Sequence, residues 1–131
     1  MRMEIEEKIR KALEGHHEII FAYLHGSFLV TEGFMDIDIA VYVDDSVRDY
    51  LEYELSLAVE LERMIGKDVD VRVLNDAPPA FRYRAIKGKV ILDRDPEVRL
   101  NFIERTVWEY LDYEPLERRM REEFLSSIKR V

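Results

Sequence analysis

The chain has 131 residues, 47% hydrophobic and 37% charged, and its 28 acidic and 20 basic side chains give a net charge of −8. This composition excludes a disordered chain, and the length is that of one domain able to bury a core. The negative charge disfavours direct nucleic-acid binding, and the absence of cysteine excludes disulfides and thiolate metal sites.

No apolar run approaches the roughly 18 residues that a membrane span requires. The N-terminal segment alternates charges and does not resemble a signal peptide. We therefore expect a cytoplasmic protein without a membrane partner.

Helices and strands are predicted to alternate along the chain. Apolar spacing predicts a helix over residues 3–13, strands over 19–24 and 36–43, and a helix over 46–65 that ends at Gly66. The inward face of residues 46–65 is expected to carry Val47, Leu51, Leu55, Ala58, Leu61 and Ile65. A strand over 68–73, a short helix between Pro78 and Gly88, and a strand over 89–92 follow.

Two helices are expected at the end of the chain. One begins at Asp95-Pro96 and runs to about Tyr113, and Pro115 begins another that runs nearly to the C-terminus. The resulting order predicts an α/β (α+β) fold with a small mixed sheet of about four strands and helices packed on it.

Two carboxylates share one face of the second predicted strand. Side chains alternate along a strand, so Ile37 and Ile39 face the core while Asp36 and Asp38 lie together on the other face, roughly 6–7 Å apart. Like charges held this close repel each other, and a divalent cation such as Mg²⁺ or Mn²⁺ would relieve the repulsion.

The third predicted strand repeats this pattern with Asp68 and Asp70. If it lies beside the second strand, Asp70 completes a three-carboxylate cluster of the kind that holds two metal ions in nucleotidyl transfer. The alternative is that these aspartates form the solvated face of a sheet, and this applies most to the Asp68/Asp70 pair.

A Gly-Ser pair ends the first predicted strand. Gly26 would let the backbone approach a phosphate closely, and Ser27 would add a hydroxyl. Most such pairs are simple turns. This one stands nine residues before an Asp-x-Asp strand, which favours the phosphate-binding interpretation.

Gly26-Ser27, Asp36-Ile37-Asp38 and Asp70 together resemble the nucleotidyltransferase superfamily that includes DNA polymerase beta, and the short chain resembles its minimal members. The stretch Leu74-Asn75-Asp76-Ala77-Pro78-Pro79 is similar to the antitoxin branch, whose partner is a HEPN-domain toxin ribonuclease. The similarity continues through Arg82, Arg84, Gly88 and Asp93–Pro96. It covers roughly residues 19–100.

The resemblance implies a Mg²⁺-dependent enzyme that transfers AMP from ATP to a toxin tyrosine. Gly26 and Ser27 would bind the nucleotide, Asp36, Asp38 and Asp70 would hold the metal, and Asp70 would help to deprotonate the acceptor. The chain length predicts a single domain over 1–131. Within it, the resemblance implies a catalytic core at about 19–93 and a helical extension at about 96–130.

The loop Phe28–Met35 departs from the family. Family members usually carry a basic residue in it and a serine just before the Asp-x-Asp, whereas this loop has no Lys or Arg, contains Glu32 and ends in Met35. The alternative function is therefore neutralisation of a partner by binding alone. Transfer to a small molecule ranks lowest, because so short a chain shows no acceptor domain.

Other features favour ordinary structural roles. Arg82, Arg84, Lys87 and Lys89 could counter a triphosphate or an acidic partner, but a solvated basic helix face is the simpler interpretation. His16 and His17 are interpreted as capping or surface residues at a helix end and not as metal ligands. His25 adjoins Gly26 and could touch a nucleotide, but a structural role is the simpler interpretation. The apolar residues of the last third, Trp108 and Tyr110 among them, suggest either core packing or a homo- or hetero-oligomer surface.

Overall fold

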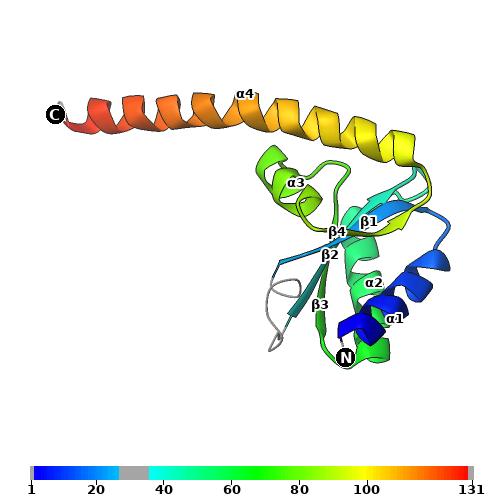
Figure 1. Ribbon diagram of the computed structural model, residues 1–131. Coiled ribbons are helices and arrows are strands. Elements are labelled where there is room, and N and C mark those ends of the chain that lie inside the picture. The colour runs from blue at the N-terminus through cyan, green and yellow to red at the C-terminus, as the bar shows by residue number, and fades with distance from the viewer. Residues whose placement is uncertain (1, 27–35, 130–131) are drawn as a thin grey trace.

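The computed structural model describes residues 2–26 and 36–129, and within them the elements follow the predicted order (Figure 1). The helices are α1 (Arg2–Glu14), α2 (Tyr50–Ile65), α3 (Pro79–Ile86) and α4 (Pro96–Lys129), and the strands are β1 (Ile19–His25), β2 (Asp36–Val43), β3 (Asp68–Val73) and β4 (Lys89–Asp93). The strands form one sheet in the order β3-β2-β1-β4. Strands β2 and β3 are parallel and the other pairs are antiparallel, so the predicted α+β fold with a mixed sheet is confirmed.

The sheet has helices on both faces. Helices α1 and α2 lie on one side, and α3 with the first part of α4 lies on the other (Figure 1). The β2 residues Ile37, Ile39 and Val41 are buried against the α1–α2 layer, as their alternation predicts. On the opposite face Phe21 stacks on Tyr42 at 4.9 Å between ring centroids. Asp36 and Asp38 belong to this second face, the one that α3 partly covers.

Helix α2 begins four residues later than predicted, because two aspartates form local hydrogen bonds before it. The Asp44 carboxylate accepts a bond from the Ser46 amide at 2.9 Å and holds a turn, and Asp49 caps the helix by accepting from the Glu52 amide at 3.0 Å. The helix ends at Gly66 in the left-handed conformation, as predicted.

The inward face of α2 was predicted only in part. Leu61 is buried together with Leu57, but Leu51 is 66% and Leu55 is 60% exposed. The helix carries apolar residues around most of its circumference, so periodicity alone did not identify the stripe that meets the sheet.

Helix α4 is one element where two were expected, since it continues through Pro115. Proline removes one backbone hydrogen bond and disfavours the helix interior. The flanking Glu, Leu, Arg and Met residues are strong helix formers, and they sustain the helix on both sides. Its second half projects beyond the body of the molecule (Figure 1). None of the described helices combines the length and apolarity needed to cross a bilayer.

Candidate nucleotidyl-transfer site

Strand pairing aligns three titratable side chains in a row across the sheet. In the parallel β2–β3 pair, Asp38 is opposite Asp70 and Asp36 is opposite Asp68. In the antiparallel β1–β2 pair, His25 is opposite Asp38. The row Asp70–Asp38–His25 therefore runs over β3, β2 and β1 on the face that carries α3. The three-carboxylate hypothesis depended on residues 68–73 lying beside residues 36–43, and this register meets that condition.

Gly26 brings the backbone directly against Asp38. A Cβ atom added to Gly26 would lie 2.2 Å from Asp38 Oδ2, and the residue has φ +79, a conformation that favours glycine. Only glycine therefore fits here without displacing the carboxylate. The glycine of the Gly-Ser motif therefore meets Asp38 of the Asp-x-Asp motif at this point. Ser27 and the rest of the loop to Met35 lie outside the described residues.

The surroundings of Asp38 raise the pKa of its carboxyl group. Partial burial raises the pKa of this carboxyl, and the charges of Asp70 and Asp36 raise it further, against the opposing influence of His25 and Arg72. Ionisation of Asp38 is thus less favourable in the folded protein than in the unfolded chain. A cation near its oxygens would remove this penalty.

His25 was interpreted from the sequence as structural, yet it lies inside the row. Burial lowers its pKa, against the charges of Asp38 and Asp70, and the nearby Arg84 cation lowers it further. Its Nε2 atom is buried and has no hydrogen-bond partner among the described residues. In the sequence, the signal that His25 belongs to the site was its position directly before Gly26.

The four basic residues between 82 and 89 do not form one patch. Arg82 is buried and donates to Glu109 of α4, the Lys87 ammonium lies 4.2 Å from the Tyr83 ring centroid, and Lys89 donates to Glu6 at 2.7 Å. Arg84 differs, because its guanidinium lies 5.8 Å from the centroid of Phe81, whose ring meets His25 edge-on at 5.6 Å.

The donor chemistry of the site suits a hard divalent cation. Asp36, Asp38 and Asp70 supply carboxylate oxygens from adjacent strand positions, which is what Mg²⁺ prefers. Across residues 2–26 and 36–129, however, no three such side chains converge closely enough to hold a metal ion. Arg72 Nε lies 3.4 Å from Asp70 Oδ1 and attracts that carboxylate. Metal binding would therefore require the Asp70 carboxylate to turn toward Asp38.

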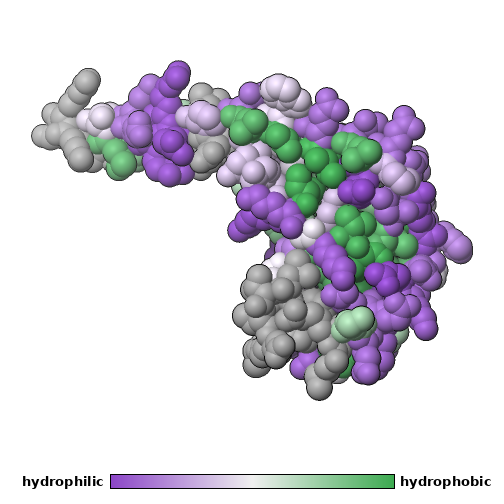
Figure 2. Space-filling view, in the orientation of Figure 1, coloured by the Kyte–Doolittle hydropathy of each residue, from purple (hydrophilic) through white to green (hydrophobic). Residues whose placement is uncertain are grey.

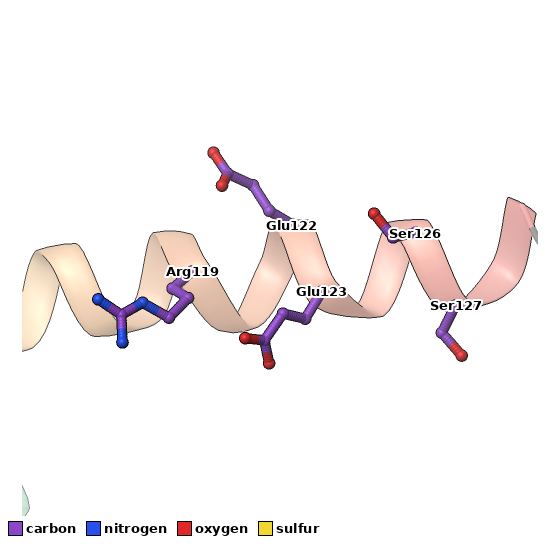
Figure 3. A pocket seen from close by; sticks show the side chains of 5 residues that line it. All are labelled: Arg119, Glu122, Glu123, Ser126 and Ser127. Atoms are coloured by element: carbon purple, nitrogen blue, oxygen red, sulfur yellow. The ribbon is translucent and has the colours of Figure 1, made fainter.

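A hollow on the distal part of α4 offers no comparable chemistry. Figure 3 shows that its lining comes from successive turns of the same exposed helix. The lining residues are Arg119, Glu122, Glu123, Ser126 and Ser127. We therefore assign no site to it.

Comparison with known proteins identifies the same core. The family model described as Polymerase beta, Nucleotidyltransferase matches residues 7–97, which include every described residue of the row. No curated protein matches the sequence.

Several solved structures share the whole fold. A Shewanella oneidensis complex of tri-AMPylated HEPN toxin with MNT antitoxin contains a chain with 22% identity and a TM-score of 0.77, over 95% of this chain and 99% of that one. A toxin–antitoxin MntA–HepT structure matches at 22% identity and a TM-score of 0.75, over 94% and 98%. A toxin–antitoxin structure with AMP-PNP matches at 23% identity and a TM-score of 0.76, over 92% of this chain and 98% of that one.

Proposed function

Because the chain belongs to the polymerase beta nucleotidyltransferase family, we propose that it is an antitoxin that transfers AMP from Mg-ATP to a tyrosine hydroxyl of a HEPN-domain toxin. The observation that carries this proposal is the contact of Gly26 with Asp38 beside Asp70, because it joins a phosphate-binding turn to the carboxylates. The similar structures add support, since one of them holds an AMPylated toxin and another AMP-PNP.

The residues have distinct roles in the proposed reaction. Gly26 and Ser27 bind the phosphates, and Asp36, Asp38 and Asp70 would hold Mg²⁺, which when bound neutralises phosphate charge. The acceptor oxygen forms a bond to the α-phosphorus, the bond from that phosphorus to the β-phosphate oxygen breaks, and pyrophosphate leaves. Asp70 takes up the proton of the acceptor hydroxyl, because Asp70 lies at the end of the row where a partner can approach.

The partner surface is proposed to lie on α4, which continues beyond the matched family region. Trp108 is 62% and Leu111 is 54% exposed, as is typical of an interface, whereas Tyr110 is engaged in stacking on Tyr83 at 4.1 Å. Figure 2 shows apolar side chains gathered where α4 crosses the body. This surface fits a partner protein better than it fits nucleic acid.

A binding-only antitoxin is the second candidate. It is favoured by the loop at residues 28–35, which has Glu32 and no Lys or Arg to attract a triphosphate. The carboxylate row argues against it, because binding by contact alone does not require mutually repelling aspartates.

Intact mass measurement of the toxin distinguishes the two functions. The purified chain, Mg²⁺, ATP and the toxin encoded beside it are incubated, with Asp36→Asn/Asp38→Asn as the control. We expect the toxin to gain one or more AMP units with the native chain and none with the variant. A stable complex without any gain would favour the binding-only antitoxin, and transfer by the variant would overturn the site assignment.

A further inference from the structure

The proposed ATP site lacks the cation that its loop should supply. A triphosphate is strongly anionic, and Arg or Lys side chains are the usual protein groups that neutralise it beside the metal. Residues 28–35 contain neither. If the chain binds ATP, a positive side chain from another element has to take this role.

Most basic residues around the row are already engaged. Arg72 lies beside Asp70, Arg82 is bound to Glu109, and Lys89 is bound to Glu6. Arg84 is exposed and forms no ion pair with a described residue. Among the described residues of α3, Arg84 and Lys87 are both exposed and outside the ion pairs, but only Arg84 lies over the ring that meets His25, so Arg84 is the one placed to bind an incoming anion beside the row.

The position of Arg84 relative to the row is defined by ring contacts. Its guanidinium lies 5.8 Å from the Phe81 centroid, and the Phe81 ring meets His25 at 5.6 Å. His25 directly precedes Gly26 and is paired with Asp38. Arg84 thus stands on the Gly26 side of Asp38, and Asp70 stands on the opposite side.

A close backbone approach keeps α3 at this position. A Cβ atom on Gly88, which lies between the α3 cap residue Lys87 and the start of β4, would lie 2.1 Å from the Leu24 carbonyl oxygen of β1. The turn that follows α3 is therefore packed tightly against the strand that leads into Gly26.

From this arrangement we propose that Arg84 binds the β- and γ-phosphates of ATP and replaces the cation absent from the loop. The inference rests on the proposed function. A nucleotide whose phosphates are held at Gly26 would extend its terminal phosphates toward α3, and the acceptor would reach the α-phosphate from the Asp70 side. The planar guanidinium can donate two parallel hydrogen bonds to phosphate oxygens.

The test compares nucleotides that differ only in the distal phosphates. Dissociation constants of Mg-AMP-PNP and of AMP are measured by calorimetry for the native chain, Arg84→Ala, Arg84→Lys and Lys87→Ala. Lys87→Ala is the matched control, because it removes the same charge from the adjoining turn, where the ammonium lies over Tyr83.

We expect Arg84→Ala to weaken Mg-AMP-PNP binding about ten- to a hundredfold and to leave AMP binding nearly unchanged. Arg84→Lys should recover part of the loss, and Lys87→Ala should bind like the native chain. An equal loss for both nucleotides, an equal loss in Lys87→Ala, or no loss at all would overturn the assignment.

Failure of the proposed function is a separate outcome. A native chain that binds Mg-AMP-PNP but does not AMPylate the toxin would contradict the enzyme and leave the Arg84 comparison fully measurable. A native chain that does not bind Mg-AMP-PNP at all would overturn the role of Arg84 as well.

Discussion

Substitutions at two glycines can separate the effect of backbone strain from the effect of displacing a carboxylate of the proposed catalytic site. Gly26 and Gly66 have φ of 79° and 78°, but an added Cβ meets the Asp38 carboxylate only at Gly26, and nothing lies within 4 Å of it at Gly66. Replacing either by Ala should destabilise the fold by about 1–2 kcal/mol, the cost of a left-handed residue. Gly26→Ala should also abolish the proposed AMP transfer, because Asp38 has to move.

The measurements for this pair are urea unfolding and the toxin mass assay. Gly66→Ala should lose stability and still transfer AMP. Normal transfer by Gly26→Ala would mean that the position of the Asp38 carboxylate is not critical.

His16 should make stability depend on pH. Its ring contacts Glu18 at 3.0 Å and Glu60 at 2.7 Å and so links the α1–β1 connection to α2. Burial lowers the pKa of His16, but the hydrogen bonds and charges of Glu60 and Glu18 outweigh it and raise the pKa overall. A raised folded pKa gives stability that is fully present below about pH 6.5 and is lost as pH rises through the folded value.

The Glu18 carboxylate, which contacts His16, defines the lower limit of the pH range in which this interaction stabilises the fold. Burial raises the pKa of Glu18, but its bonds from Tyr53, a backbone amide and His16 outweigh burial and lower the pKa, so its contribution to stability is lost only as pH falls through that lowered pKa. His16→Gln should therefore cost up to about 1 kcal/mol near pH 5.5 and less near pH 8.5. Urea unfolding at both values tests this, with the exposed neighbour variant His17→Gln as control. A difference that grows with pH would contradict the prediction.

At the scale of elements, local signals were predictable and contacts between elements were not. Alternation located Asp36, Asp38 and Asp70 on strands, and Gly26 ended the first strand as expected. The roles proposed for His25 and Arg84 depend on strand register and on how α3 docks, and neither is encoded within a window of neighbouring residues. For the same reason, the apolar spacing of residues 46–65 predicted that Leu51 and Leu55 face inward, whereas both are exposed.

The packing of α4 on α3 should depend on one buried cation. Arg82 is only 5% exposed, and it donates to Glu109 while its Nε atom has no partner among the described residues. Glu109→Ala would leave the guanidinium uncompensated, and we expect a loss of about 1–3 kcal/mol in the free energy of unfolding. Arg105→Ala removes the exposed partner of the same carboxylate, 3.8 Å away, and should cost less than about 1 kcal/mol. Equal losses would mean that burial of Arg82 adds nothing.

At the scale of the whole molecule, the chain is acidic, and four of its aspartates are paired where the nucleotide is proposed to bind. The net charge is −8, and the first 45 residues contain 10 acids against 4 bases. Asp36, Asp38, Asp68 and Asp70 then occupy paired positions at one end of β2 and β3. The folded chain without a divalent cation should therefore be destabilised by repulsion at this edge.

Thermal unfolding with and without Mg²⁺ tests this prediction. The raised pKa of Asp38 means that its ionisation opposes folding, so stability should increase as pH falls toward that pKa. Mg²⁺ should raise the Tm of the native chain by several degrees, since 1 kcal/mol corresponds to about 2–8 °C for domains near this size. Asp36→Asn/Asp38→Asn should match or exceed the metal-free native Tm and should not respond to Mg²⁺. NaCl at equal ionic strength measures the part due to screening. An equal Mg²⁺ response in both proteins would mean that the ion acts elsewhere than on these carboxylates.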